Sequence, residues 1–378
     1  MQSSLKAPQG LFNLNRYPIR NNEQLRAWDA ADELVLEHVA TLSHEHDLSG
    51  ANTLIINDHF GALSVALHHL QPTMISDSYI AKSAANYNLK QNHLPALNFL
   101  NSMECLQGNY DLVIIKVQKS LAQLEDQLHK LRQHLHKDSI VIGCAMVKMI
   151  HTSNINLFEN IIGSTKTSLA QKKARLIFSH YNQELTVKPN PYPQSYLLDN
   201  NPWQILNHAN VFSRAKLDIG CRFFMENIPS SSDEKTIIDL GCGNGIVGMI
   251  AAKNNPNACI DFYDESYMAV ASAEHNFTQV FDSHRQASFN VDDCLSSRAA
   301  NSADLILNNP PFHQQNAIGD FIAWQMFSQS HKVLKKSGEL WVIGNTHLGY
   351  QQKLKKLFGH CEKMHSNAKF VILRAIKK

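Results

Sequence analysis

A glycine-rich turn in the second half of the chain is the sequence feature that most restricts its fold. The apolar run Thr236–Leu240 predicts a buried strand, which leads directly into a turn containing Gly241, Gly243, Asn244 and Gly245 and then into a helical pattern. Glycine permits positive φ angles and lets a ligand come close to the backbone. A strand, a glycine turn and a helix in this order are typical of nucleotide-binding α/β folds. We therefore expect a Rossmann-like sheet with the turn at its binding edge.

Acidic residues near the ends of the predicted strands indicate what the turn binds. Asp264 ends the next predicted strand, 260–264, and a carboxylate there can accept hydrogen bonds from both hydroxyls of a ribose. Asp293 follows the predicted strand 289–291, where it can accept a hydrogen bond from an adenine amino group. A capping or loop role for Asp293 is the alternative interpretation.

The position of Asp239 separates two classes of cofactor. Nicotinamide enzymes usually place a helix N-terminus against a pyrophosphate. Here Asp239 stands just before the glycines, and its charge would repel a phosphate. S-adenosylmethionine has no phosphate, and its ammonium and sulfonium groups tolerate a nearby carboxylate. The sequence therefore favours S-adenosylmethionine, with a nicotinamide cofactor as the competing hypothesis.

The tetrapeptide Asn309-Pro310-Pro311-Phe312 follows the apolar run 305–307, which predicts another buried strand. Open α/β sheets bind ligands beyond the carboxyl ends of such strands. Because proline fixes φ and has no N–H, the Asn309 side-chain oxygen and the Pro310 carbonyl can point into a pocket as acceptors. We predict that they accept hydrogen bonds from an exocyclic amine while Phe312 stacks on its ring, and that Asn309 also borders the cofactor. A turn that is merely stiffened by proline is the alternative.

The first half of the chain repeats this order of elements in a degenerate form. Predicted strands at 53–56, 73–75, 112–115 and 140–142 alternate with helical patterns, as in a parallel sheet with crossover helices. Segment 77–81 matches 265–269, and 111–114 matches 304–307. This alignment places Lys116 opposite Asn309 and Ser76 opposite Asp264, and only Gly61 is kept in the turn. We therefore predict an α/β chain of two tandem Rossmann-like domains, of which the N-terminal one is degenerate.

The boundary between the two domains is expected where prolines and polar residues gather, in segment 182–203. We place a degenerate, RNA-binding domain at 1–190 and a catalytic domain at 191–378. Basic residues of the first domain could contact RNA phosphates, although a solvated charged face is the simpler interpretation. The candidates are Lys116, Lys119, Lys172, Lys173 and Arg175.

Composition restricts the partners. The formal net charge of +2 gives no general positive field, so a nucleic acid would have to be held by local basic patches. The 7 cysteines include no C-x-x-C pair, and the 20 histidines form no ligand-spaced set, so we expect no metal. No signal-peptide pattern or bilayer-length apolar run is present in the sequence. We expect a cytoplasmic protein without a membrane partner.

The second half resembles class I S-adenosylmethionine-dependent methyltransferases, through Asp239–Gly245, Asp264 and the Asn-Pro-Pro-Phe tetrapeptide. The whole chain is similar to the RsmC/RlmG family of ribosomal RNA guanine-N2 methyltransferases, through segments 27–32, 208–214 and 309–315. The resemblance implies an inactive N-terminal domain that aids RNA binding. It also implies that Phe212, Asp218 and Gly220 contribute to the cofactor pocket.

The resemblance further implies the reaction, which is transfer of a methyl group from S-adenosylmethionine to N2 of one guanine in 23S rRNA, with S-adenosylhomocysteine as the product. The partner would be 23S rRNA, either naked or in an assembling large subunit, and we expect a monomer. Alternative substrates are a guanine of 16S rRNA, adenine N6 and a protein glutamine. A non-catalytic ribosome-assembly factor, which uses both halves to hold RNA, is a hypothesis of a different class.

Overall fold

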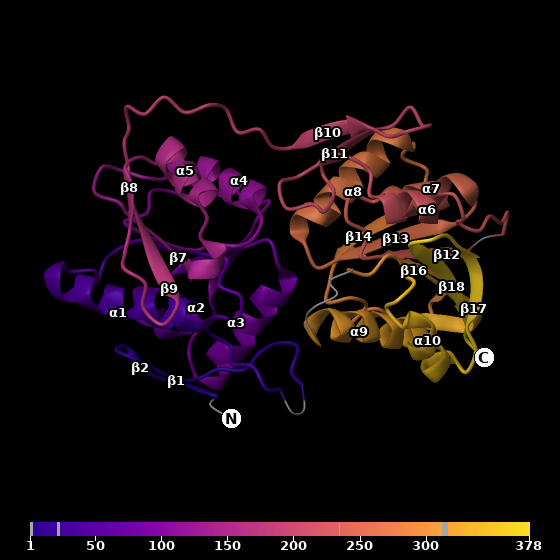
Figure 1. The fold of residues 1–378 in the computed structure, drawn as a ribbon, viewed down its shortest axis with the longest axis horizontal. Coiled ribbons are helices and arrows are strands. Elements are labelled where there is room, and N and C mark those ends of the chain that lie inside the picture. Colours follow the sequence, from indigo (N-terminus) through magenta and orange to yellow (C-terminus); the bar gives the residue numbers. More distant parts are fainter. Residues whose placement is uncertain (1–2, 21–22, 234, 312–316) are drawn as a thin grey trace. The chain divides into compact units, whose positions relative to one another are not determined.

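The computed structural model describes residues 3–20, 23–233, 235–311 and 317–378, with side chains in the last range from Phe321 onward. The chain divides into two compact units, Met1–Tyr192 and Pro193–Lys378 (Figure 1). The division falls close to the boundary expected at residue 190. Each unit has its own sheet and its own apolar core, so each is described by itself.

The first unit is built on a seven-stranded sheet with the spatial order β5-β4-β3-β6-β7-β9-β8. Neighbours from β5 to β7 run parallel, whereas β9 is antiparallel to both β7 and β8. Its strands are β3 (Thr53–Ile56), β4 (Thr73–Ser76), β5 (Asn98–Asn101), β6 (Leu112–Lys116), β7 (Ile140–Met146), β8 (Thr165–Thr167) and β9 (Ala174–His180). A separate hairpin consists of β1 (Ser4–Ala7) and β2 (Gly10–Asn13). The α-helices are α1 (Ala30–Glu45), α2 (Ala62–Ala66), α3 (Tyr79–Gln91), α4 (Leu121–Arg132) and α5 (Thr152–Ile161), and short 3₁₀ turns are η1 (His68–Leu70) and η2 (Val147–Met149).

The second unit repeats this architecture with the order β14-β13-β12-β15-β16-β18-β17. Its first five strands are again parallel, and β18 is antiparallel to β16 and β17. The strands are β12 (Thr236–Leu240), β13 (Cys259–Asp264), β14 (Ala287–Val291), β15 (Ala303–Asn308), β16 (Leu334–Asn345), β17 (Glu362–Ser366) and β18 (Phe370–Ile376). A hairpin of β10 (Gln194–Leu197) and β11 (Gln204–Asn207) precedes them. The helices are α6 (Ile219–Met225), α7 (Ile246–Asn254), α8 (Tyr267–Val280), α9 (Ala317–Val333) and α10 (Tyr350–Phe358).

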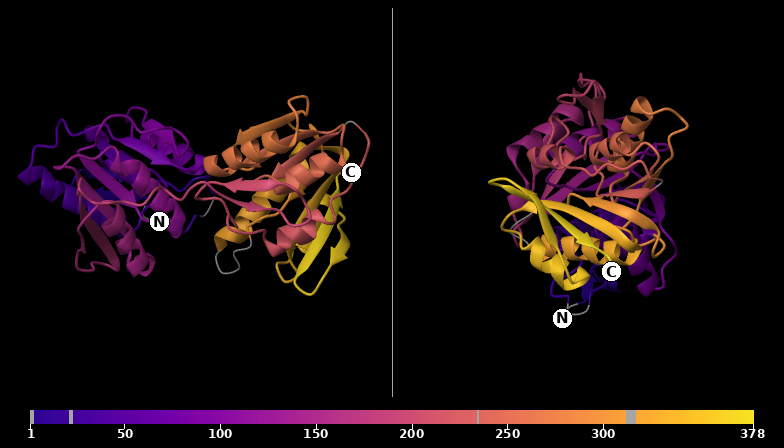
Figure 2. Two further views of the ribbon diagram at one scale, coloured as in Figure 1. Left: turned by 90° about the horizontal axis from the view of Figure 1, so that it is seen from above. Right: turned by 90° about the vertical axis from the view of Figure 1, so that its right-hand side faces the viewer.

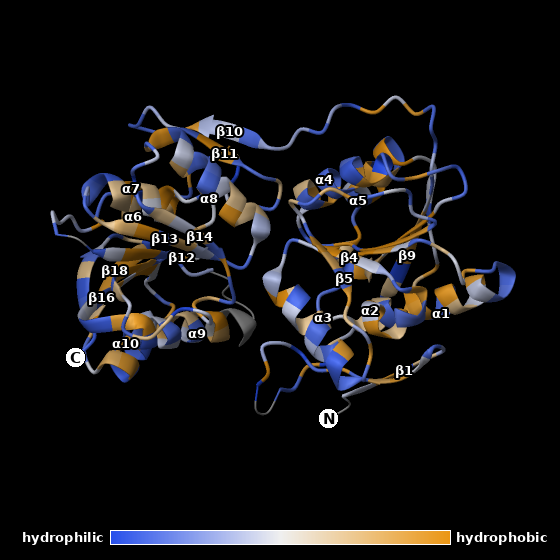
Figure 3. Cartoon of the chain, turned by 180° about the vertical axis from the view of Figure 1, so that it is seen from behind, coloured by the Kyte–Doolittle hydropathy of each residue, from blue (hydrophilic) through white to orange (hydrophobic). Residues whose placement is uncertain are grey.

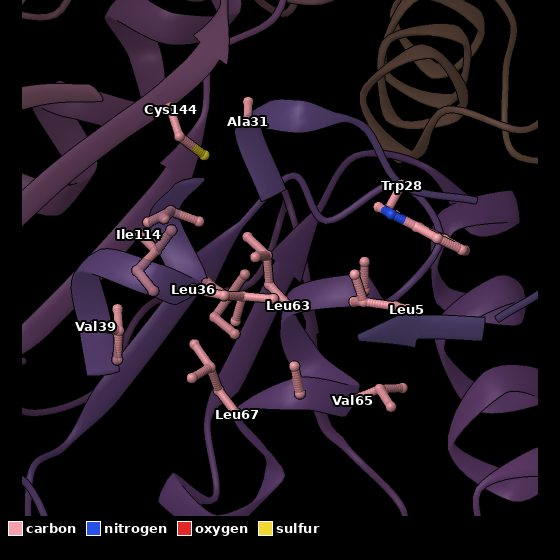
Figure 4. Packing of buried hydrophobic residues seen from close by; sticks show 14 of the residues in the cluster. Leu5, Trp28, Ala31, Leu36, Val39, Leu63, Val65, Leu67, Ile114 and Cys144 are labelled. Atoms are coloured by element: carbon pink, nitrogen blue, oxygen red, sulfur yellow. The ribbon is translucent and has the colours of Figure 1, made fainter. Parts of the chain in front are cut away.

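Helices cover both faces of each sheet (Figures 1 and 2). In the first unit, α1 and α2 pack on one face through a cluster that includes Trp28, Leu36, Leu63 and Ile114 (Figure 4). Residues of α4 and α5 fill the core on the other face. In the second unit α6, α7 and α8 share one core, and α9 and α10 share the other. Apolar residues therefore concentrate on the strands and on the inner sides of the helices (Figure 3), as burial of apolar surface requires.

The two sheets confirm the predicted tandem Rossmann-like fold and the alignment of the halves. Ile56 pairs with Ile115 in the first sheet, and Leu240 pairs with Asn308 in the second, so the next residues, Lys116 and Asn309, occupy equivalent positions. Periodicity predicted β3, β4, β6 and β7 of the first sheet and β12, β13, β14 and β15 of the second, but it missed the parallel strands β5 and β16. It also missed β8 and β9 in the first sheet and β17 and β18 in the second, whose antiparallel pairing makes each sheet mixed rather than parallel. The two separate hairpins, β1–β2 and β10–β11, were missed as well.

Membrane-spanning helices and metal-holding clusters are both absent from the part of the chain that the structure describes. No helix among the described residues is long and apolar enough to cross a bilayer. In the same part of the chain, no three side chains of histidine, cysteine, aspartate or glutamate come together as a group able to hold a metal ion.

Candidate active site

The glycine turn links the end of β12 to α7 and is fixed by the neighbouring strand. The backbone N–H groups of Gly241 and Cys242 both donate to the Tyr263 carbonyl, at 2.8 and 3.0 Å. Gly241, Gly243 and Gly245 have φ angles of 75°, 54° and 83°, which residues other than glycine rarely adopt. The turn therefore requires glycine for its backbone conformation, as the sequence predicted.

The space beside Gly243 is open. A Cβ atom added at Gly243 would meet no heavy atom within 4 Å, whereas one at Gly245 would lie 2.8 Å from Ala273. Gly245 thus allows helix α8 to pack closely, while Gly243 leaves its backbone accessible to a ligand. This difference identifies the Gly243 side of the turn as the surface on which a cofactor can lie.

Asp264 and the glycine turn are joined directly. One carboxylate oxygen of Asp264 accepts a hydrogen bond from the Gly243 N–H at 3.0 Å, and the other accepts one from the Ser266 N–H at 3.0 Å. The side chain is half-buried at the end of β13. Two backbone donors thus orient the carboxylate at the turn, where lone pairs left over can accept from a ribose.

Asp239 is buried next to the turn and binds the backbone of helix α7. Its carboxylate accepts a hydrogen bond from the Gly248 N–H in α7 at 2.8 Å. Burial raises the pKa of Asp239 to about 7, with the Gly248 bond acting against this shift and the negative charge of Asp264 adding to it. Asp239 therefore anchors the start of α7, and contact between Asp239 and a cofactor stays a prediction.

Asn309 lies directly after β15 and has a buried side-chain oxygen. The side-chain amide of its neighbour Asn308 donates to the Leu240 carbonyl at 2.8 Å, so the end of β15 is fastened to the end of β12 just before the glycine turn. The Asn309 Oδ1 atom is buried and has no hydrogen-bond partner among the described residues. The Asn308 Oδ1 atom likewise has no partner among these residues. A buried acceptor without a partner costs free energy, and a ligand that donates a hydrogen bond can remove this cost. Pro310 is buried beside it, and Phe312 lies outside the described residues.

The loop after β14 is organised by Asp292, which the sequence analysis did not single out. Its carboxylate accepts hydrogen bonds from the Ser297 N–H and hydroxyl, at 2.8 and 2.7 Å, and also from the Ser296 hydroxyl. Asp293, the predicted adenine ligand, accepts from the Gln325 side chain of α9 at 2.8 Å. Asp293 is thereby fixed in orientation, and its contact with adenine stays a prediction.

The hairpin of β10 and β11 is tied to the glycine turn, which sequence patterning also missed. The Asn244 side-chain amide donates to the Asn207 side-chain oxygen at 2.9 Å and contacts the Tyr196 hydroxyl at 3.5 Å. Asn276 of α8 donates to the Asn244 carbonyl at 3.0 Å. The Asn244 amide therefore holds the hairpin to the turn, so any cofactor contact by Asn244 must use its remaining atoms.

The segment before β12 lies close to the same strand end. Asp218 caps α6 by accepting from the Cys221 N–H at 2.9 Å. Burial raises the pKa of the Cys221 thiol well above its usual value, and the charges of Asp239 and Asp218 raise it further, so all three groups are neighbours. A Cβ at Gly220 would lie 3.1 Å from Phe370, and Phe212 is exposed. Participation of Phe212, Asp218 and Gly220 in a cofactor pocket stays a prediction.

The basic residues predicted to bind RNA fall into different environments. Lys116 is buried, and its Nζ atom contacts the Asp32 carboxylate at 2.5 Å. The prediction that Lys116 contacts RNA is therefore wrong, because its ammonium group is neutralised inside the first unit. Lys119, Lys172 and Lys173 are exposed, although Lys172 pairs with Glu33 at 3.1 Å, and Arg175 is half-buried. For these four residues RNA binding stays a prediction.

The site thus combines three chemical capacities at one sheet edge. The open Gly243 backbone and the oriented Asp264 carboxylate can hold a ribose-containing cofactor, and the polar donors and acceptors present fit S-adenosylmethionine. Asn309 adds a buried acceptor suited to an amine. Asp264 supplies negative charge next to the turn, which suits a cationic sulfonium compound better than a pyrophosphate.

Comparison with known proteins agrees with this geometry. Residues 2–183 match the family model of the RLMG N-terminal domain, and residues 202–374 match that of the methyltransferase small domain. The ribosomal RNA large subunit methyltransferase G of Pseudoalteromonas translucida (strain TAC 125) is 47% identical over 97% of this chain and 96% of its own length. The protein of the same name from Yersinia enterocolitica serotype O:8 is 46% identical over 97% of this chain and 92% of its own length.

Among solved structures, one from T. Thermophilus has a similar fold along the whole chain. It is the 16S rRNA N2 G1207 methyltransferase (RsmC) in complex with AdoMet and guanosine. The TM-score is 0.77 at 19% identity, and the match covers 99% of this chain and 97% of the other. At this identity the comparison establishes that both proteins share the tandem fold.

Proposed function

Because the chain belongs to the ribosomal RNA large subunit methyltransferase G family, we propose that its second unit methylates the exocyclic N2 of one guanine in 23S rRNA. The chain is a methyltransferase, and S-adenosylmethionine is its methyl donor. The observation that supports an amine as the methyl acceptor is the buried Oδ1 atom of Asn309, which has no hydrogen-bond partner among the described residues. A structure with the same fold was solved with AdoMet and guanosine, which supports a guanine base as the acceptor.

We assign the cofactor to the glycine turn. When bound, S-adenosylmethionine supplies a methyl group on a positively charged sulfur, which is already a good leaving group. Asp264 accepts hydrogen bonds from the ribose hydroxyls, and Asp293 accepts from the adenine amino group. The open backbone at Gly243 admits the cofactor. The Asn244 amide, through Asn207, keeps the β10–β11 hairpin against the turn.

Guanine N2 is a poor nucleophile because its lone pair is delocalised into the ring. The Asn309 Oδ1 atom and the Pro310 carbonyl accept its two hydrogens, which favours a pyramidal nitrogen and directs the lone pair toward the methyl group. Alignment of this kind contributes through proximity and through preorganised dipoles. Phe312 stacks on the base, and the base reaches the site unpaired or flipped out of its helix. After transfer the nitrogen loses a proton to solvent.

The first unit supports binding of the same RNA without transferring a methyl group. Its turn has Asn57, Asp58 and His59 where the second unit has Gly241, Cys242 and Gly243, and Lys116 replaces Asn309. We propose domain roles at 1–190 and 191–378 as expected from the sequence, and a monomer that acts in the cytoplasm, where rRNA is made. The candidate phosphate contacts are exposed Lys119, Lys172 and Lys173 and half-buried Arg175.

A methylation assay tests this function. The purified protein is incubated with a radiolabelled methyl donor and with either protein-free 23S rRNA, 16S rRNA or assembled large subunits, and the modified nucleoside is identified by mass spectrometry. We expect N2-methylguanosine in 23S rRNA, and the preferred substrate form is read from the same experiment. N6-methyladenosine, methylglutamine in a protein or label in 16S rRNA would replace the proposed acceptor.

The Asn309→Ala variant tests the role of the acceptor atom. We expect a fall in kcat of about 10²-fold or more, comparable with the loss of one preorganised polar group at a reacting centre, and little change in affinity for S-adenosylhomocysteine. Asn257→Ala, in an exposed loop of the same unit, is the matched control. If Asn309→Ala kept full methyl transfer, the amine clamp would be wrong, and full loss of transfer in the control would point to general damage.

A further inference from the structure

An aromatic and basic cluster lies outside the glycine turn and the Asn309 loop, between α9 and α10. Trp324, Gln352, Lys353 and Lys356 line a shallow hollow of about 320 Å³, here termed the Trp324 hollow. The Lys356 Nζ atom lies 5.5 Å from the centroid of the Trp324 ring. Trp324 is half-buried, and Lys356 is exposed on α10. Neither the cofactor site nor the amine clamp uses these side chains.

Lysines outnumber acidic residues around the hollow, because α9 has one acidic residue, Asp320, four residues before Trp324, and α10 has none. From Phe321 to Val333, and throughout α10, the sequence has no aspartate or glutamate, while Lys332 and Lys355 add to the lysines that line the hollow. In a chain with a formal net charge of only +2, this is a local concentration of positive charge. Such a patch attracts a polyanion without requiring a basic protein overall.

The residue types fit a single-stranded nucleic acid. An indole face accepts a stacked base of any identity, and lysine ammonium groups contact the phosphates on either side. The Gln352 side chain can donate and accept hydrogen bonds at a base edge. An apolar peptide helix would instead need a row of apolar residues, and three of the four lining side chains are polar or charged.

The hollow is built on elements that start at the catalytic edge of the sheet. Helix α9 begins at Ala317, a few residues after Pro311, and Trp324 lies about two turns, or about 10 Å, along it. Helix α10 follows the carboxyl end of β16, which is parallel to β15, the strand that carries Asn309 at its end. Both helices that carry the hollow therefore begin at the sheet edge where Asn309 lies, which makes nucleotides that flank the target base the candidates for the hollow.

We propose that the Trp324 hollow binds an unpaired nucleotide that flanks the target guanine, with the base stacked on Trp324 and the adjoining phosphates held by Lys353 and Lys356. The inference rests on the proposed function in that it takes RNA as the substrate. It adds a contact to the RNA made by the catalytic unit itself, so target selection does not depend on the first unit alone.

A binding experiment with the full chain tests the proposal. The probe is a fluorescein-labelled oligouridine of about twelve nucleotides, which has no secondary structure. We expect Trp324→Leu to raise the Kd about tenfold, because stacking is lost, whereas Trp324→Phe keeps a ring and stays within about threefold of the parent. The double variant Lys353→Gln/Lys356→Gln should reduce the slope of log K against log salt by about 1.4, since two phosphate contacts are removed.

Controls make each outcome decisive. Lys336→Gln/Lys363→Gln removes two exposed lysines elsewhere on the same unit and should leave the Kd and salt slope unchanged. S-adenosylhomocysteine affinity and the melting temperature report whether each variant is folded. If Trp324→Leu does not fold, the double variant of half-buried Lys353 and exposed Lys356 decides the proposal alone. Parent-like oligouridine binding by both the leucine and the double-lysine variants would overturn it.

Two further results separate this inference from the proposed function. If the variants bind oligouridine normally but lose affinity for large subunits, the hollow takes an acidic protein segment and the RNA proposal is wrong. If the parent protein methylates 23S rRNA while all variants bind oligouridine equally, only the hollow proposal fails. If the variants lose affinity for oligouridine but the parent methylates no rRNA, the hollow is supported and the proposed function fails.

Discussion

Two aspartates beside one glycine turn illustrate how burial decides what a carboxyl group does. Asp264 is half-buried and retains access to a ligand, while Asp239 lies under the turn with the Gly248 N–H as its partner. Burial raises the pKa of Asp239 to about 7, above the value of about 4 for an unfolded chain. Because the proton is bound more tightly in the folded state, Asp239 favours folding most in its neutral form.

This pKa shift predicts a pH dependence of stability at the residue scale. The folded state binds more protons than the unfolded state between pH of about 4 and about 7, so the contribution of Asp239 to stability is present below pH 4 and is lost as the pH rises toward 7. Asp239→Asn cannot ionise and should remove this loss. The free energy of unfolding of the variant, minus that of the parent, should therefore rise with pH by up to about 1.4 kcal/mol per unit in this window.

Urea unfolding of the second unit at several pH values, followed with and without S-adenosylhomocysteine, measures this difference. Asp282→Asn, in an exposed position, is the matched control and should run parallel to the parent. A difference that stays flat from pH 4 to 7 would mean that Asp239 is not protonated more readily in the folded protein.

At the scale of elements, Lys116 and Asn309 show how the two units diverged at one position. Lys116 ends β6 and Asn309 directly follows β15, and each of these strands pairs with the strand before the turn. Lys116 is directed inward and joins β6 to α1 through Asp32, across 84 residues of sequence. Burial alone lowers the pKa of Lys116, but the carboxylates of Asp32, Asp29 and Asp58 outweigh it and raise the pKa above its usual range. The lysine therefore stays charged and paired.

We predict that breaking this pair destabilises the first unit. Lys116→Met leaves the Asp32 carboxylate buried without its partner and should cost about 3–5 kcal/mol of unfolding free energy. Lys116→Met/Asp32→Asn removes both charges, and asparagine can still accept the Asp29 N–H as Asp32 does at 2.9 Å, so this double variant should recover most of the loss. Chemical denaturation of the full chain measures both.

Lys119→Met removes an exposed lysine three residues away and serves as the control, with a change below about 0.5 kcal/mol. Equal destabilisation by the single and double variants would show that the Lys116 side chain, rather than the charge pair, supports the unit. S-adenosylhomocysteine affinity should be unaffected in every case, because the second unit holds the cofactor site.

The same elements show which parts of the fold and of the site can be predicted from the sequence and which cannot. The strand and helix alternation, Asp264 and the glycine turn follow from local patterns, and the structure confirms the tandem fold. The burial of Lys116 depends on a partner 84 residues away, which no local pattern reveals. The strands β10 and β11 are polar and proline-flanked, so the hairpin that reaches Asn244 resembled a linker.

At the scale of the whole molecule, the two units have a glycine at the same position, directly before the helix that follows the turn. Gly61 and Gly245 each cap the helix after the turn with positive φ, 79° and 83°. A Cβ at Gly61 would lie 2.6 Å from the Ala85 Cα atom, and one at Gly245 would lie 2.8 Å from the Ala273 Cβ atom. Since real Cβ atoms do not approach so closely, alanine at either position must displace the facing helix.

We therefore predict that Gly61→Ala and Gly245→Ala each destabilise one unit only. The strained φ costs about 1–3 kcal/mol, and the close contact adds to it. Each unit has its own core, so we expect two unfolding transitions. Gly61→Ala should lower the midpoint temperature of the transition that S-adenosylhomocysteine does not shift. Gly245→Ala should lower the midpoint temperature of the transition that this ligand raises. Differential scanning calorimetry with and without the ligand resolves the two transitions.

Gly50→Ala is the control for the substitution itself, since Gly50 is exposed, has no positive φ and would gain no contact within 4 Å. It should leave both transitions in place. If Gly61→Ala also lowered the ligand-sensitive transition, the two units would unfold as one cooperative body, and the first could not be treated as a separate RNA-binding domain. If only its own transition moved while methylation of 23S rRNA weakened through a higher KM, the degenerate unit would be acting on substrate binding and not on the transfer step.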